Sequence, residues 1–156
     1  MLSNEVQELS ELLIANGLTI SVAESCTGGS LSRDLTSIPG ASSYFDCGYV
    51  TYSNKSKVDM LGVDIQTIET YGAVSEEVAL EMVIGVATKS HSDIAVSVTG
   101  VAGPTGGTPE KPVGTVCFGF SYDGKTSAST KIFSGDRASI VSQSVSYALK
   151  QLSLRY

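Results

Sequence analysis

The sequence predicts an α/β fold, a three-layer α/β/α sandwich around a mixed sheet of about five strands that includes one hairpin. Segments with helical periodicity alternate with short runs of strand-forming residues along the chain. Two of these runs flank Asp123-Gly124, a dipeptide typical of tight hairpin turns. No repeat, linker or low-complexity segment divides the chain, so residues 1–156 are expected to form one domain.

The first predicted helix covers residues 3–16 and ends at Gly17. Its apolar residues recur at helical spacing on one face, which is formed by Val6, Leu9, Leu12 and Leu13. Residues 18–23 follow as a short buried strand. The helix is therefore expected to cover a sheet.

The segment 23–29, A-E-S-C-T-G-G, joins this strand to a second helix over residues 31–37, which ends before Pro39. Free backbone N–H groups at such a junction can hold an anion or a developing oxyanion. Cys26 is a candidate nucleophile, but without an imidazole partner small buried packing explains it better. Glu24 is either catalytic or a cap, and the pattern leaves both open. The segment matches neither the phosphate-binding loop of nucleotide triphosphatases nor the dinucleotide fingerprint.

Residues 39–57 combine a strand with the start of a helix. Aromatic and β-branched residues over 44–51 favour an extended strand, entered through a Pro-Gly turn. Ser53 or Asn54 is a good helix cap, so the chain is expected to turn from strand to helix there. Tyr52 would then end the strand.

The same stretch carries groups that can supply a nucleophile, a proton relay and a base: Ser42, Ser43, Tyr52 and Lys57. Lys57 would lie in the first turns of the helix. Ser42 precedes Tyr52 by ten residues, so another part of the fold must bring it close. A capped helix after an ordinary strand, with exposed lysines, is the simpler explanation of this stretch taken alone.

Two helices are predicted next, over residues 64–71 and 75–89. Gly72 closes the first, and Ser75 caps the second, whose early glutamates suit its positive end. The second helix has a buried stripe of Val78, Ala79, Met82, Val83 and Val86.

The strand predicted over residues 93–99 runs directly into G-V-A-G-P-T-G-G at 100–107. Four glycines in eight residues allow close approach by a ligand, and a flexible surface loop explains them equally well. Residues 113–122 and 127–133 are the two strands of the predicted hairpin.

Asp136 is predicted to cap the final helix. One face of that helix is apolar and comprises Val141, Val145, Ala148, Leu149 and Leu152. Arg137 at its start either binds a phosphate or carboxylate or is simply solvated. Ligands of open α/β sheets collect at the carboxyl ends of strands, and Ser25, Tyr52 and Gly100 each follow a predicted strand. If those strands are parallel, the three motifs meet at one rim.

The composition and net charge of the chain limit the kinds of molecule that it is expected to bind. The chain has 156 residues, 42% of them hydrophobic and 17% charged, an ordinary globular balance. Its ten Lys and Arg are scattered and its net charge is −6, which argues against nucleic acid but leaves a small anionic ligand open. No apolar run approaches the roughly 20 residues of a membrane span, and the N-terminal residues lack the features of a signal peptide. A soluble, cytoplasmic protein without membrane contact is expected.

Neither the cysteines nor the histidine predict a metal site. Cys26, Cys47 and Cys117 are odd in number and widely spaced, and they include no C-x-x-C pair. With His91 as the only histidine, a His-based metal site or a Ser-His-Asp triad is hard to build. Its place at a predicted helix end fits a solvated or capping role.

Several short motifs follow one another in order along the chain. They are A-E-S-C-T-G-G (23–29), G-A-S-S-Y-F (40–45), Y-S-N-K-S-K (52–57), G-A-V-S (72–75), T-G-V-A-G-P-T-G-G (99–107), K-P-V-G-T-V (111–116) and F-S-G-D-R (133–137). Together they resemble the motifs of the CinA C-terminal domain family, whose characterised members are nicotinamide mononucleotide amidohydrolases. The resemblance covers nearly the whole chain.

The resemblance implies hydrolysis of the carboxamide of nicotinamide mononucleotide to nicotinate mononucleotide and ammonia, without a metal or other cofactor. By motif, the nucleophile would be Ser42, with Tyr52 and Lys57 handling its proton. The choice of Lys57 over Lys55 follows the family spacing Y-[ST]-N-x-x-K. The substrate-binding residues implied are Ser25, Thr27, Gly28, Thr99, Gly100, Ala102, Gly103 and Arg137, the last near the ligand phosphate. A homodimer would also suit the resemblance.

This chemistry needs a base, because a free serine hydroxyl is a weak nucleophile and the departing ammonia must be protonated. Neutral Lys57 is expected to take the Ser42 proton directly or through Tyr52. Its pKa must then fall by roughly two to three units from about 10.4, and burial, the helix start and Lys55 would all lower it. Backbone N–H groups of one Gly-rich turn would stabilise the oxyanion. The sequence does not decide which of these turns it is.

Two other classes of protein fit part of the pattern. A nucleotide-binding or regulatory module would bind the ligand without turnover, and stabilisation by ligand without ammonia release would identify it. A short-chain oxidoreductase is suggested by a neighbouring Tyr and Lys. Those enzymes use a Tyr-x-x-x-Lys spacing, whereas Tyr52 and Lys57 are five apart and no dinucleotide fingerprint precedes them.

Overall fold

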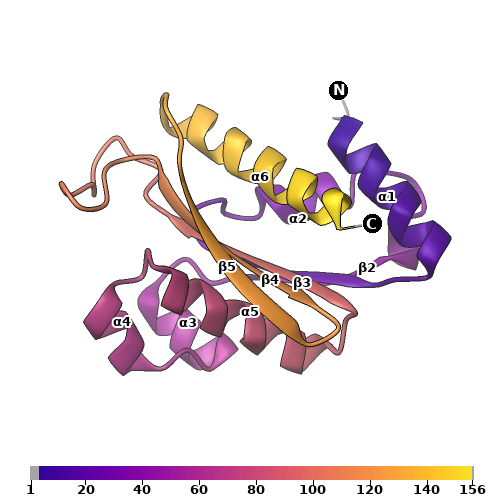
Figure 1. The fold of residues 1–156 in the computed structure, drawn as a ribbon, viewed down its shortest axis with the longest axis horizontal. Helices are drawn as coiled ribbons and strands as arrows, with labels where there is room; N and C mark the ends of the chain where they lie inside the picture. Colours follow the sequence, from indigo (N-terminus) through magenta and orange to yellow (C-terminus); the bar gives the residue numbers. More distant parts are fainter. Residues whose placement is uncertain (1–3, 156) are drawn as a thin grey trace.

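The computed structural model describes residues 4–155 and contains a five-stranded sheet with helices on both faces (Figure 1). The predicted three-layer α/β/α architecture is thereby confirmed. The elements, in chain order, are α1 (Asn4–Asn16), β1 (Ile20–Glu24), α2 (Ser30–Leu35), the 3-10 helix η1 (Ala41–Ser43), β2 (Phe45–Val50), α3 (Asn54–Leu61), α4 (Ile65–Tyr71), α5 (Glu76–Ser90), β3 (Ile94–Gly100), β4 (Thr115–Tyr122), β5 (Lys125–Ile132) and α6 (Arg137–Leu154).

The sheet is mixed and has the strand order β2-β1-β3-β4-β5. Strands β1, β2 and β3 are mutually parallel, whereas β4 runs antiparallel to β3 and β5 antiparallel to β4. The carboxyl ends of β1, β2 and β3 therefore meet at one edge of the sheet, where β4 begins. This confirms that the motifs after these three strands share a rim.

Helices cover both faces of the sheet (Figure 1). Helices α1, α2 and α6 lie on one face, and α3, α4 and α5 lie on the other. The core on the first side includes Leu9, Phe118 and Leu149, which are at most 1% exposed. The core on the second side includes Met82 and Val83 of α5, both fully buried.

Local sequence signals set several of the element boundaries. Ser53, Ser75 and Asp136 cap α3, α5 and α6, and each side chain accepts a hydrogen bond from a backbone N–H of the helix that it starts. Asp123 and Gly124 have φ values of 51° and 82°, the pair of positive values that a two-residue type I′ hairpin requires. Strand β5 accordingly begins at Lys125, two residues before the predicted start. Helix η1 was not predicted.

Among residues 4–155, no helix is long and apolar enough to cross a membrane. The same residues include no group of three or more His, Cys, Asp or Glu side chains arranged to hold a metal ion.

Candidate active site

Lys57 is buried at the rim of the sheet and contacts Ser25. The lysine side chain is 1% exposed, and its Nζ lies 2.9 Å from Ser25 Oγ and 2.9 Å from the Thr51 carbonyl oxygen. A third contact, of 3.5 Å, joins Nζ to the carbonyl oxygen of Tyr52. Because β2 ends at Val50 and Ser53 caps α3 soon afterwards, Lys57 lies one turn into the helix and reaches across to Ser25 at the end of β1.

Burial lowers the pKa of Lys57 from 10.5 to about 8, against a smaller opposing effect of Cys26. The surroundings also suit the neutral amine. Its lone pair can accept the Ser25 hydroxyl proton while its two N–H groups donate to the carbonyls of Thr51 and Tyr52. Ser25 and Lys57 therefore have the hydrogen-bond geometry that a nucleophile and its base require.

Lys55 has the opposite environment. Its amine is exposed to solvent and pairs with Asp59 one turn further along α3. That hydrogen bond and the charge of Asp59 raise the pKa of Lys55. Of the two lysines in this motif, only Lys57 has a lowered pKa.

Ser25 is held in place by the sheet as well as by Lys57. It directly follows β1, is 7% exposed, and its backbone N–H donates to the Val98 carbonyl of β3 at 2.9 Å. Its hydroxyl opens into a cleft of about 200 Å³. Seven of the predicted site residues line this cleft: Ser25, Tyr52, Lys57, Thr99, Gly100, Ala102 and Arg137.

Arg137 crosses the mouth of the cleft. Its guanidinium donates to the Tyr52 hydroxyl at 2.7 Å and to the Gly103 carbonyl at 2.8 Å. It thereby links the start of α6 to the loop after β2 and to the loop after β3. We call this arrangement the Arg137 clasp.

Thr99 fixes one wall of the cleft. It is 1% exposed, and its hydroxyl donates to the Ala73 carbonyl at 2.9 Å. Ala73 and Val74 both line the cleft, as do Cys26 and Asn54. The sequence motifs G-A-V-S and Y-S-N-K-S-K contain three of these residues, Ala73, Val74 and Asn54, although the sequence analysis assigned none of them to the site.

Glu24 is a helix cap in this structure. Its carboxylate is fully buried and accepts hydrogen bonds from the backbone N–H groups of Leu31 and Ser32 at the start of α2. The Thr27 hydroxyl also donates to Glu24, at 2.7 Å, so the Thr27 side chain supports the turn and does not line the cleft. Gly28 is exposed and likewise lies outside the lining.

Cys26 lines the cleft as a neutral thiol. Burial, with a smaller contribution from the neighbouring Glu24, raises its pKa to about 12. A thiol with such a pKa is a poor nucleophile near neutral pH.

Ser42 does not join these residues, so the predicted convergence of Ser42 with Tyr52 and Lys57 is wrong. It lies in η1 before β2, whereas Tyr52 follows β2, and the six residues of that strand span about 20 Å. Its side chain is exposed and does not line the cleft. The parallel pairing of β1 with β2 brings Ser25, not Ser42, beside Lys57.

Comparisons with known proteins agree with this fold and these motifs. The model of the CinA C-terminal domain matches residues 3–155. The chain is 49% identical over 144 residues to the nicotinamide-nucleotide amidohydrolase PncC of Enterobacter agglomerans, covering 92% of this chain and 88% of that protein. It is 46% identical over 157 aligned positions to the PncC of Escherichia coli strain K12, covering 97% and 95% of the two chains.

A solved structure supports the same assignment. The crystal structure of the competence damage-inducible protein A from Klebsiella pneumoniae superposes with a TM-score of 0.94 at 38% identity, covering 97% of this chain and 94% of that one. A match of the family model over nearly all residues, together with this level of identity, establishes common descent and fold. The chain belongs to the CinA C-terminal domain family.

Proposed function

We propose that this protein hydrolyses the carboxamide of nicotinamide mononucleotide, releasing nicotinate mononucleotide and ammonia. The observation that carries the proposal is the contact between the buried Lys57 amine and the Ser25 hydroxyl in a cleft at the sheet rim. The substrate comes from the relatives named nicotinamide-nucleotide amidohydrolase, which match the chain over most of its length.

Ser25 is the nucleophile in this proposal, in place of Ser42. Neutral Lys57 takes the Ser25 proton as Oγ bonds to the carboxamide carbon, and the carbonyl electrons move to oxygen. When the tetrahedral intermediate collapses, the C–N bond breaks and protonated Lys57 gives its proton to the departing ammonia. Water then attacks the acyl-enzyme, Lys57 takes a proton from it, and Ser25 recovers its proton as the carboxylic acid leaves.

The oxyanion donors are assigned to the turn that follows Ser25. The N–H of Ser25 is bonded to Val98, and Gly28 bonds within the turn, to the Ser25 carbonyl. Among the described residues, the N–H groups of Cys26 and Thr27 have no acceptor on another residue. They lie next to the nucleophile, where a negative oxygen would form. Loss of one oxyanion donor typically slows the chemical step by about 10²- to 10³-fold.

Tyr52 is assigned to positioning and not to proton transfer. Its backbone carbonyl, not its phenol, contacts Lys57, while its hydroxyl accepts from Arg137. The direct contact between Lys57 and Ser25 makes a relay unnecessary. In this proposal Tyr52 and Arg137 hold the outer part of the nucleotide.

The experiment is to incubate the purified protein with nicotinamide mononucleotide and measure ammonia and nicotinate mononucleotide in equal amounts over time. Added chelator should leave the rate unchanged, because the proposed step uses only Ser25 and Lys57. Tight binding of the nucleotide without either product would instead favour a nucleotide-binding module.

A further inference from the structure

The Glu24 carboxylate joins the turn that carries Ser25 to the helix that follows it. The turn comprises residues 25–29 and lies between β1 and α2. One carboxylate oxygen accepts from the Thr27 hydroxyl at 2.7 Å and from the Leu31 N–H at 2.9 Å. The other oxygen accepts from the N–H and the hydroxyl of Ser32, at 2.9 and 2.7 Å. The side chain directly before Ser25 therefore receives four hydrogen bonds from the turn and the helix.

A carboxylate suits these four donors better than any other side-chain group. Each of its two oxygens can accept two hydrogen bonds, and it carries no N–H or O–H group of its own. An amide in its place would turn an NH2 group toward two of the donors, because only its oxygen accepts. Glu24 is fully buried and Thr27 is 3% exposed, so water would not replace a lost bond between them.

The turn needs this support because glycines make its backbone conformationally free. Gly28 and Gly29 have φ values of 56° and 101°, which glycine adopts about as readily as negative values. Two backbone hydrogen bonds close the turn, from Gly28 to the Ser25 carbonyl at 3.1 Å and from Ser30 to the Thr27 carbonyl at 2.9 Å. The bond from the Thr27 hydroxyl to Glu24 adds a buried side-chain contact that fixes the middle of the turn.

The main chain of Glu24 is fixed by the strand that also positions the proposed base. The Glu24 carbonyl accepts from the Thr51 N–H at 2.8 Å, and the Thr51 carbonyl accepts from Lys57 Nζ at 2.9 Å. The next residue, Ser25, contacts the same Nζ through its hydroxyl. Glu24 thus connects the turn to the nucleophile and the base of the proposed reaction.

We propose that Glu24 is a positioning residue, which acts through Thr27 to direct the N–H groups of Cys26 and Thr27 at the developing oxyanion. This proposal rests on the proposed function and adds a residue to it. Glu24 does not line the cleft, so its effect reaches the reaction through the turn and not through contact with the substrate. A misplacement of about 1 Å in an active site can cost about 10²-fold in rate. Loss of the carboxylate should therefore lower kcat and leave KM almost unchanged.

The test compares two hydroxyls that bind the same carboxylate. Thr27→Val removes the bond from the turn, and Ser32→Ala removes the bond of equal length from α2. With nicotinamide mononucleotide, Thr27→Val should lower kcat at least about tenfold and change KM less than about twofold. Ser32→Ala should change kcat less than about threefold. Thr27→Ser keeps the hydroxyl and should restore kcat to within about twofold of that of the unmodified protein.

Urea unfolding of the same variants separates positioning from a loss of stability. The rates are compared at a temperature at which each variant is folded. An unchanged kcat in Thr27→Val would overturn the proposal, and so would equal losses of kcat in Thr27→Val and Ser32→Ala. A loss of kcat that Thr27→Ser does not restore would also overturn it.

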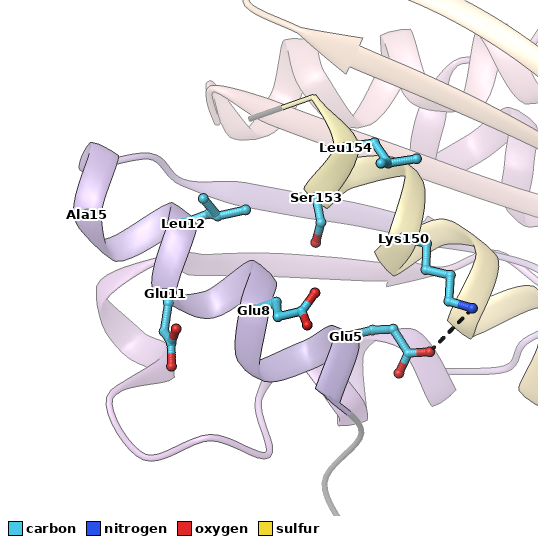
Figure 2. Close-up of a pocket in the computed structure, with 8 residues that line it drawn as sticks. All are labelled: Glu5, Glu8, Glu11, Leu12, Ala15, Lys150, Ser153 and Leu154. Carbon is cyan, nitrogen blue, oxygen red and sulfur yellow. Dashed lines mark ion pairs between the residues drawn. The ribbon is translucent and has the colours of Figure 1, made fainter.

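Glu24→Gln tests the carboxylate itself. Its kcat should fall at least about 10²-fold, because the amide group opposes two of the four donors. Glu8→Gln is the matched control, since Glu8 is an exposed glutamate of α1 at a cavity that shares no lining residue with the cleft (Figure 2). Glu8→Gln should leave kcat unchanged. A folded Glu24→Gln with the kcat of Glu8→Gln would refute the proposal, and if Glu24→Gln does not fold, the Thr27 variants decide.

An ester probe separates this proposal from the proposed function. With p-nitrophenyl acetate, Ser25 Oγ bonds to the carbonyl carbon as Lys57 takes its proton, and the carbonyl electrons move to oxygen. The C–O bond then breaks, p-nitrophenolate leaves and the acetyl group stays on Ser25. The same oxyanion donors are needed, but the nucleotide is not. Ser25→Ala gives the rate that does not depend on this serine.

The two substrates together distinguish the outcomes. Release of p-nitrophenolate that depends on Ser25 and falls about tenfold in Thr27→Val supports the positioning role, even if the nucleotide yields no ammonia and the proposed hydrolysis is refuted. Ammonia release that is equal in Thr27→Val and the unmodified protein keeps the hydrolysis and overturns the positioning role. Absence of both reactions in the unmodified protein refutes both proposals.

Discussion

Nζ of Lys57 lies 2.9 Å from Oγ of Ser25, although the two residues are 32 positions apart in the chain. The lysine is buried, its pKa is lowered to about 8, and its other hydrogen bonds go to backbone carbonyls. A buried amine with a lowered pKa next to a hydroxyl is typical of a catalytic base.

The choice between the two serines is testable by single substitutions. Ser25→Ala should slow ammonia release by at least about 10³-fold, because it removes the proposed nucleophile. Ser42→Ala should retain a rate close to that of the unmodified protein, since Ser42 is exposed and lies at the far end of β2. If Ser42→Ala lost most of its ammonia release while Ser25→Ala stayed active, Ser42 would be the nucleophile.

The pH dependence of the rate should follow the protonation state of the Lys57 amine. Because the neutral amine is the active form, kcat/KM should rise about tenfold per pH unit below pH 7 and level off above the lowered pKa of about 8. Lys57→Met should abolish this rise along with most of the activity. Lys55→Met should preserve the activity and its rise with pH, because Lys55 is an exposed lysine paired with Asp59. A pH profile of kcat/KM that changes only in Lys55→Met would contradict the assignment of Lys57 as the base.

The lowered pKa of Lys57 also predicts a pH dependence of stability. Between pH 8 and about 10.5 the unfolded chain binds a proton at this lysine that the folded protein has released, so folded stability rises with pH in this window. Lys57→Met has no titratable group at this position, so its stability lacks this contribution. The free energy of unfolding of the unmodified protein, measured with urea from pH 7 to pH 11, should gain about 3 kcal/mol relative to Lys57→Met. Parallel pH curves would show that the lysine is not perturbed.

Cys26 should not react with alkylating reagents, because its thiol is buried with a pKa of about 12. Iodoacetamide at pH 7.5 should modify the half-exposed Cys47 first and leave Cys26 unmodified, as judged by peptide mass spectrometry. Activity should survive this treatment, and Cys26→Ala should retain turnover. Rapid inactivation that tracks alkylation of Cys26 would make the thiol a competing nucleophile.

Tyr52→Phe distinguishes positioning from proton transfer. It removes the hydroxyl that accepts from Arg137 but keeps the backbone carbonyl that contacts Lys57. KM should rise severalfold while the turnover rate stays within about threefold of that of the unmodified protein, because one hydrogen bond of the Arg137 clasp is lost. If turnover instead slowed by about 10³-fold or more with unchanged KM, the phenol would be assigned to the proton relay.

Local signals in the sequence were sufficient to predict the order of the α-helices and strands and many of their ends, but not the 3-10 helix η1. Ser53, Ser75 and Asp136 cap helices, and Asp123-Gly124 forms the hairpin turn, because each effect involves only residues a few positions apart. The positions of Tyr52 after a strand and Lys57 one turn into a helix follow from the same signals.

The tertiary structure alone decided which hydroxyl meets the lysine. Strand order β2-β1-β3 places the end of β1 beside the end of β2, so Ser25 approaches Lys57, while Ser42 is left at the opposite end of β2. The burial that lowers the pKa of Lys57 likewise arises from elements distant in the chain. Strand pairing depends on apolar burial summed over the whole sheet, and no local spacing of residues encodes it.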